Sequence, residues 1–192
     1  MSTLLTNQII SPPLEDEILA TRAVDDSSAF AELYKRHFDR VYRYHVAHTG
    51  SVEDAQDLTT QTFIAALEGI ATYRGDGSFS AWLLGIARRK MAQLYRSRRP
   101  ETSLESIQHL PDQTNSPEER SSQNIQLSQI SRALRQIKTE RAEALELCLY
   151  GDLSAAEAGL ILGKSEAAIK MLVCRGLKDL RQKCALIMQE EK

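Results

Sequence analysis

Cysteine, glycine and proline are all scarce in this chain of 192 residues. The three cysteines, Cys148, Cys174 and Cys184, are odd in number and widely spaced. This spacing argues against a disulfide framework and against paired zinc ligands, so reduced thiols are expected. Nine glycines and five prolines leave long stretches without helix breakers. Together with abundant Ala, Leu, Glu, Arg, Lys and Gln, this composition predicts an all-α protein.

Long apolar runs and catalytic or metal-binding motifs are missing as well. No segment approaches the roughly 20 apolar residues needed to cross a bilayer. Residues 1–11 lack the basic flank and apolar stretch of a signal peptide, so a cytoplasmic protein without a membrane span is expected. The four histidines form no HExxH motif, and no metal or other cofactor is expected. No nucleophile–base set or phosphate loop is present, which makes an enzyme the least expected class.

The chain does carry many charges, and they are unevenly distributed. Its formal net charge is −2, yet residues 28–100 hold eleven bases against seven acids, and residues 125–192 hold eleven against nine. Residues 1–27 and 101–124 each hold five acids and one base. Two basic segments with an acidic connector can indicate nucleic-acid binding, because local basic patches attract phosphates. Ordinary solvated helix faces would account for this pattern about equally well.

Helix signals divide the chain into two small helical domains. Apolar residues at three-four spacing predict a four-helix domain over residues 14–99, in which Ser51 begins the third helix as a capping residue. Residues 100–124 are polar and acidic with three prolines, which predicts a flexible linker. Residues 125–183 then predict further helices and a helix-turn-helix, with a capping box at Ser154 and a turn at Gly163.

The helix before Pro100 is the sharpest local signal. Its last twelve residues contain six bases and no acid. Like charges at this density repel one another, so phosphate is the expected counter-charge. Bases in the last turn would also suit the helix dipole, but those at the start of the basic stretch would not. The expected DNA contacts are Arg88, Arg89, Lys90, Gln93, Arg96, Arg98 and Arg99.

The helix after Gly163 is the expected recognition helix of the second domain. A recognition helix lies in the major groove and presents residues near its N-terminus to base edges. The residues expected to contact DNA are Ser165, Glu166, Lys170, Arg175 and Lys178. A helix-turn-helix alone is only moderately specific, because other helical bundles also contain capped helix pairs.

Taken together, the two domains resemble extracytoplasmic-function (ECF) sigma factors over residues 14–183. The order and spacing of the matching stretches carry this resemblance. These stretches are residues 29–38, 54–58 with 62–63, 73–79 with 82–83 and 86–88, 116–119, and 153–170 with Arg175.

The resemblance implies a non-enzymatic subunit that joins RNA polymerase core and recognises and opens promoter DNA. The third helix would dock on the polymerase clamp helices through Asp54, Asp57, Leu58, Gln61 and Phe63. Residues 73–79 and the basic helix would read the −10 element, with Tyr73 and Arg89 at a pocket for one flipped base. The second domain would bind the −35 element and the polymerase flap, and the linker would follow the RNA exit path. An anti-sigma factor is a further expected partner.

Several positions depart from the usual family pattern, and two other functions stay open. Arg89 stands where Asn is usual, and Thr60 and Gln61 replace Gln and Glu. Met171, Leu172 and Cys174 depart in the recognition helix, so promoter specificity is not defined by the resemblance. A sigma-mimicking protein that binds only an anti-sigma factor is one alternative, although the intact basic helix argues against it. An autonomous helix-turn-helix regulator is the other, and it would shift duplex DNA without polymerase.

Limited proteolysis is expected to cut first within residues 100–124, because this acidic segment has too few apolar residues to bury. Mass spectrometry of the early fragments would locate the cut. Early cleavage inside residues 28–99, with the linker protected, would contradict the two-domain prediction.

Overall fold

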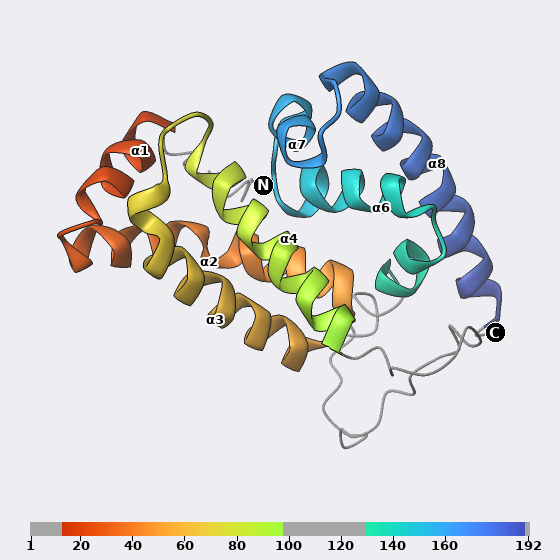
Figure 1. The fold of residues 1–192 in the computed structure, drawn as a ribbon. Helices are drawn as coiled ribbons and strands as arrows, with labels where there is room; N and C mark the ends of the chain where they lie inside the picture. The colour runs from red at the N-terminus through yellow and green to blue at the C-terminus, as the bar shows by residue number, and fades with distance from the viewer. Residues whose placement is uncertain (1–12, 98–129, 191–192) are drawn as a thin grey trace, which may run out of the picture.

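The computed structural model describes residues 13–97 and 130–190, and every regular element within them is helical (Figure 1). The all-α prediction is confirmed, whereas the predicted linker lies outside the described residues, as do Arg98 and Arg99. Residues 130–135 are helical. The named elements are α1 (Pro13–Arg22), α2 (Ser27–Thr49), α3 (Val52–Gly69), the 3₁₀ turn η1 (Ile70–Thr72), α4 (Phe79–Ser97), α6 (Thr139–Leu145), the π-helical turn η2 (Glu146–Tyr150), α7 (Ala155–Leu162) and α8 (Glu166–Glu190).

The first helical group contains α1 to α4. Helix α2 ends at Gly50, which adopts a left-handed conformation with φ of 68°, and Ser51 then caps α3 by accepting a hydrogen bond from the Asp54 amide at 3.3 Å. These two residues reverse the chain, so that α3 packs back along α2 and α4 packs against both. The apolar faces meet in a core that includes Leu33, Leu58 and Leu83, all almost fully buried.

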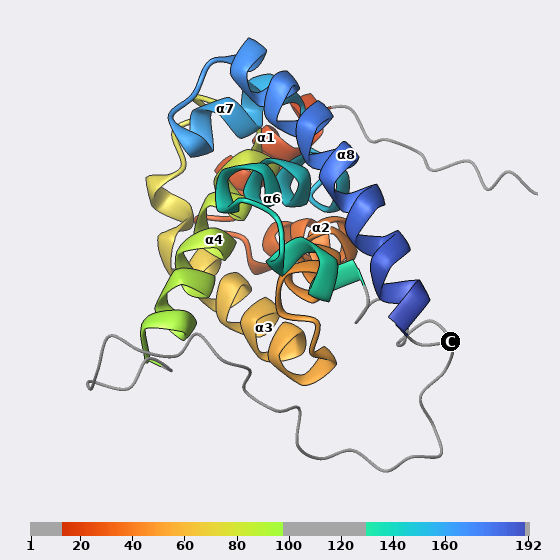
Figure 2. The same ribbon diagram turned by 90° about the vertical axis from the view of Figure 1, so that its right-hand side faces the viewer.

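The second helical group contains α6, η2, α7 and α8, and it includes the predicted helix-turn-helix. Ser154 and Glu157 form the predicted capping box at the start of α7. Helix α7 ends at Gly163, whose φ of 64° permits the left-handed cap that turns the chain into α8. Helices α6 and α7 both pack against α8, which runs along the outer side of the group (Figure 2).

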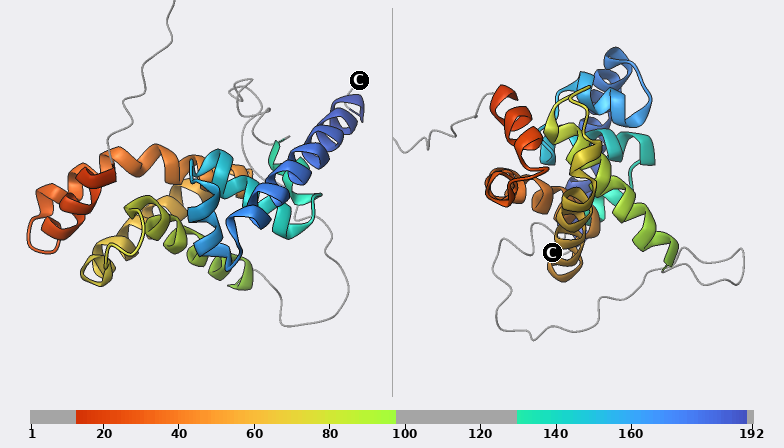
Figure 3. Two further views of the ribbon diagram at one scale, coloured as in Figure 1. Left: turned by 90° about the horizontal axis from the view of Figure 1, so that it is seen from above. Right: turned by 60° about the vertical axis from the view of Figure 1, so that its left-hand side comes forward.

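The two groups lie side by side and share their apolar interior (Figures 1 and 3). One buried cluster joins Leu84 of α4 to Leu147 of η2 and Ala158 of α7. A second cluster joins Ala47 of α2 to residues of the second group, including Leu145. The sequence pattern predicted two domains without predicting this contact between them.

A nearly buried histidine–glutamate contact also crosses the junction. Glu146 of η2 has a side chain only 3% exposed, and its Oε2 lies 2.6 Å from Nδ1 of His48 on α2. Tyr44 is buried beside this pair, and burial together with the charges of Glu146 and Glu143 raises the pKa of its hydroxyl. The tyrosine therefore stays neutral and adds no charge to the junction.

Replacing Gly159 tests the helix-turn-helix geometry. A Cβ atom at Gly159 would lie 2.6 Å from the Lys164 carbonyl oxygen, so the backbone of the turn would have to move. Gly159→Ala should therefore lower the free energy of unfolding by about 1–3 kcal/mol. Gly85→Ala is the matched control in α4, where a Cβ meets nothing within 4 Å and should stabilise the helix by about 0.5–1 kcal/mol. Thermal unfolding would compare the two variants. A higher melting temperature for Gly159→Ala than for Gly85→Ala would contradict the close approach of the turn to Gly159.

Replacing either His48 or Glu146 tests the buried contact between them. His48→Ala should lower the free energy of unfolding by about 1–3 kcal/mol, because it leaves the buried Glu146 side chain without its 2.6 Å hydrogen-bond partner. Glu146→Gln should cost less, since the amide can still hydrogen-bond to the imidazole. Urea titrations would compare the two. A larger cost for Glu146→Gln would show that His48 is not the partner that satisfies Glu146.

Candidate nucleic-acid and polymerase interface

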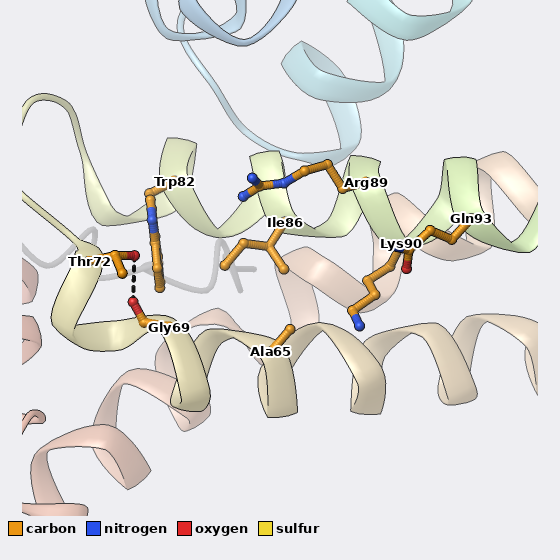
Figure 4. Close-up of a pocket in the computed structure, with 8 residues that line it drawn as sticks. All are labelled: Ala65, Gly69, Thr72, Trp82, Ile86, Arg89, Lys90 and Gln93. Atoms are coloured by element: carbon orange, nitrogen blue, oxygen red, sulfur yellow. Dashed lines mark hydrogen bonds between the residues drawn. The ribbon is translucent and has the colours of Figure 1, made fainter.

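A hollow of about 210 Å³ lies between α3 and α4, and α4 is the helix that carries the predicted basic residues (Figure 4). Arg89 extends over Ile86 toward Trp82, and Lys90 extends from α4 toward α3. Eight residues line this hollow, which we call the α3–α4 pocket: Ala65, Gly69, Thr72, Trp82, Ile86, Arg89, Lys90 and Gln93. Three of the predicted DNA-binding residues are therefore together in one pocket.

Three aromatic rings support one end of this pocket. Phe79 is buried, and its ring centroid lies 5.6 Å from that of Tyr73 and 5.5 Å from that of Trp82. The Tyr73 hydroxyl donates a 2.7 Å hydrogen bond to the Gly77 carbonyl, which fixes the loop between η1 and α4. Burial raises the pKa of Tyr73 to about 12, so this donor stays protonated at neutral pH.

Tyr73 does not line the same pocket as Arg89. It lines a neighbouring hollow of about 270 Å³, to which Leu160 and Ile161 of α7 also contribute. Thr72 and Trp82 line both hollows. The sequence predicted Tyr73 and Arg89 at one pocket; in this structure they line two neighbouring hollows.

Arg88 lies at the junction between the two helical groups. Its Nη2 donates to both carboxylate oxygens of Glu143 on α6, at 3.1 and 3.3 Å. The sequence predicted phosphate as the counter-charge of Arg88, but in this structure the counter-charge is Glu143, 55 residues later in the chain. Arg43 of α2 makes a similar contact, with Nη2 2.6 Å from Asp152.

The loop before α4 also contacts the second group. Ser78 donates a hydrogen bond to Glu157 of α7. Burial alone would raise the pKa of Glu157, but hydrogen bonds from Ser154 and Ser78 outweigh it and hold the pKa below its ordinary value. Glu157 therefore remains charged and ties α7 to the loop.

Helix α3 presents a mixed polar and apolar surface. Asp57 is exposed, and its carboxylate accepts a 2.7 Å hydrogen bond from Gln61 one turn later. Leu58 and Phe63, two of the predicted polymerase contacts, are buried at 1% and 4% exposure, because they face α2 in the core. Their side chains are not presented to a partner in this structure.

Two apolar residues of α3 are exposed to solvent instead. Ile64 is 53% exposed and Leu67 is 50% exposed. Asp57, Gln61 and Ile64 follow one another at four- and three-residue spacing, so they form one stripe on the helix surface. We call these residues with Leu67 the α3 stripe.

Helix α8 carries the predicted recognition residues on one exposed face. Ser165 precedes the helix, and its hydroxyl accepts from the Ala168 amide at 3.3 Å. Glu166 and Lys170 pair with each other at 2.6 Å. The other exposed members of this face are Met171, Cys174, Arg175 and Lys178, whereas Leu172 packs against the core.

The described residues hold no group of three or more His, Cys, Asp or Glu side chains that could bind a metal ion. Among the same residues, no helix combines the length and the apolar character required to cross a membrane.

Two family models and several known proteins match this chain. The family model of sigma-70 region 2 matches residues 33–101, and that of sigma-70 region 4 matches residues 127–180. The ECF sigma factor BldN of Streptomyces coelicolor is 32% identical over 85% of this chain, which spans 63% of BldN. The sigma factor YlaC of Bacillus subtilis is 27% identical over 84% of this chain and 95% of its own length.

The solved structure of CnrH in complex with the cytosolic domain of CnrY has the same fold. Its TM-score is 0.68 at 24% identity, and the match covers 93% of this chain and 99% of CnrH. The two halves of the chain thus match the two sigma-70 regions in order, and their helices are arranged as in a sigma factor. The chain belongs to the ECF family of RNA polymerase sigma factors.

Proposed function

We propose that this protein joins RNA polymerase core, recognises promoter DNA and promotes strand opening. The observation that supports this most directly is the α3–α4 pocket, which combines Trp82 with Arg89 and Lys90 and adjoins the helix that carries the α3 stripe. Residues 14–99 would dock on polymerase and read the −10 element, and residues 125–183 would read the −35 element. Transcription requires no chemistry from this chain itself, since polymerase supplies it.

The pocket suits a base that has left the duplex. Strand opening costs roughly 1.4 kcal/mol per base-pair step, and a flipped base costs a few kcal/mol more. Stacking of one base on an aromatic ring returns about 1–3 kcal/mol. Trp82 offers such a surface, while Arg96 and Lys90 can hold neighbouring phosphates. Together these contacts favour the open strand over the duplex.

The junction must change when DNA binds along α4. Arg88 Nη2 cannot hold a phosphate while it holds Glu143, and α7 lies against the reading loop through Ser78 and Glu157. We propose that polymerase and DNA bind a form in which the two groups have separated. The −10 and −35 contacts then lie at different places on the promoter.

The proposed partners are the polymerase clamp helices for the α3 stripe, the polymerase flap and promoter DNA for the second group, and an anti-sigma factor. The solved relatives CnrH and RpoE are described in complexes with CnrY and with the anti-sigma factor NepR, which supports the last partner. Function inside the cytoplasm, where polymerase works, is part of the proposal.

Run-off transcription with purified core polymerase tests the proposed sigma-factor function. An autonomous regulator would instead bind promoter duplex without polymerase, which a gel shift with DNA alone would detect.

Asp57→Arg tests the α3 stripe. Asp57 is exposed on α3, so the change should alter folding by only about 0.5 kcal/mol. Reversing its charge against a basic clamp surface should cost on the order of 2–5 kcal/mol of binding. The variant should therefore fail to co-elute with core polymerase while it keeps its helical circular-dichroism signal and melting temperature.

The matched control is Asp39→Arg, which makes the same charge change at an exposed position of α2. It should co-elute with core polymerase like the unaltered protein. If Asp57→Arg assembles holoenzyme at the same concentration as the unaltered protein, the clamp contact lies elsewhere. Unfolding of Asp57→Arg would show that this residue is structural.

A further inference from the structure

Two arginines of α2 converge on one carboxylate of the second helical group. Arg43 Nη2 lies 2.6 Å from Oδ2 of Asp152, and Arg40 Nε lies 3.9 Å from the same oxygen. Within residues 13–97 and 130–190, no other acid forms an ion pair with either arginine. The counter-charge of both arginines therefore comes from the other group, 109 residues after Arg43 in the chain.

Other contacts fix the side chain of Arg40. Its Nη1 donates a hydrogen bond to Ser80 Oγ in the first turn of α4 and lies 3.3 Å from Nδ1 of His37. Nε2 of His37 lies 2.8 Å from a carboxylate oxygen of Asp16 on α1. The Nε atom of Arg40 is buried and has no hydrogen-bond partner among the described residues, because Asp152 is too distant. A second acceptor oxygen at this place would satisfy it.

Asp152 reaches the arginines from an unfavourable backbone conformation. Its φ is 51°, and no other residue except glycine has a positive φ in the described parts of the chain. This left-handed conformation is costly for a residue with a Cβ atom, although Asp and Asn tolerate it better than most. The Asp152 side chain is also 45% exposed, and exposed ion pairs are weak. Another anion can therefore displace this carboxylate.

We infer that Arg40 and Arg43 form a site for one backbone phosphate of promoter DNA, which Asp152 occupies as a substitute for phosphate while the two groups are in contact. We call it the Arg40–Arg43 site. This inference rests on the proposed function, because it requires that promoter DNA binds the first group. The bond from Arg40 to Ser80 places the site next to the loop before α4, which the proposed function assigns to reading of the −10 element.

The chemistry of phosphate suits this site better than that of a carboxylate from Asp152. A phosphodiester carries two charged oxygens outside the chain of the DNA backbone, and arginine binds such oxygens by charge-assisted hydrogen bonds. One oxygen can accept from Arg43 while the other accepts from Arg40 Nε. Separation of the groups removes Asp152 and leaves two cations close together. Phosphate would then compensate their charge, so DNA and the second group compete for one site.

The salt dependence of promoter binding by the complete holoenzyme tests the phosphate contact. Arg43→Gln is the suitable variant, because Arg43 is exposed whereas Arg40 also bonds to Ser80. The slope of log affinity against log salt concentration should fall by about 0.7–0.9, the loss expected for one phosphate contact. Arg22→Gln is the matched control, since it makes the same change at an exposed arginine of α1 that pairs with Asp26. Its slope should stay unchanged.

A second measurement tests the competition, with the full chain in the absence of polymerase. Asp152→Asn keeps the size of the side chain and suits the left-handed backbone, but it removes the competing charge. It should bind a labelled single-stranded oligonucleotide about 2- to 5-fold more tightly at low salt. Arg43→Gln breaks the same ion pair and loosens the junction equally, but it also removes the site. It should therefore give no such gain. Circular dichroism would confirm that both variants are folded.

The outcomes distinguish the inference from the proposed function. If the unaltered holoenzyme opens no promoter, the proposed function is wrong. If it does, but Arg43→Gln keeps the full salt slope, the inference is wrong and the function stands. The inference is also wrong if Asp152→Asn gives no gain in oligonucleotide affinity. An equal gain for Asp152→Asn and Arg43→Gln would overturn it as well, because opening of the junction alone would then control DNA binding.

Discussion

The arrangement of this protein depends on one close apolar contact between its two helical groups. Leu84 of α4 and Leu147 of η2 are fully buried in a shared cluster. Gly151 makes their approach possible, because a Cβ atom there would lie 2.7 Å from Leu84 and 2.6 Å from the Leu147 carbonyl oxygen. Apolar burial is the main favourable contribution to such a contact. The charged pairs around this contact determine the relative orientation of the two groups more than they add to the free energy of the contact.

Those charges have opposite signs on the two sides. Arg43 and Arg88 come from the first group, and Asp152 and Glu143 come from the second. All four side chains are partly exposed, so each pair contributes only about 0–1 kcal/mol. Phosphates can therefore replace the acids at the rim at little cost. Separation of the groups costs more at the apolar contact, and a polymerase surface that covers it would offset that cost.

The sequence predicted the local features of the fold well, because they depend on neighbouring residues. The capping box at Ser154 and the left-handed turn at Gly163 follow from hydrogen bonding and backbone sterics within a few residues. Contacts between distant segments could not be predicted in this way. The pairing of Arg88 with Glu143 depends on how two helices approach in space, and helical periodicity carries no information about that approach.

The same distinction applies to the candidate site. Arg89, Lys90 and Gln93 were predicted from their basic helix, and the structure groups them in one pocket. Ala65 and Gly69 line the same pocket from α3, but they carry no polar or charged group, so their place in the site could not be predicted from the sequence. On α3 itself, Leu58 and Phe63 were predicted to contact polymerase, but both are buried in the core, because the sequence alone does not show which face of the helix packs on α2.

The two DNA-reading surfaces differ in what their side chains can recognise. On the exposed face of α8, Met171 and Cys174 lie between Lys170 and Lys178, and neither is a strong hydrogen-bond donor. Lys170 is also paired with Glu166. Lysine contacts to phosphate position a protein on DNA, whereas hydrogen bonds to base edges specify the sequence. In the α3–α4 pocket, by contrast, an unpaired arginine lies beside a tryptophan in an open hollow of about 210 Å³. In the proposed complex, α8 therefore contributes mainly affinity and position, and the choice of promoter depends more heavily on the base held in the pocket.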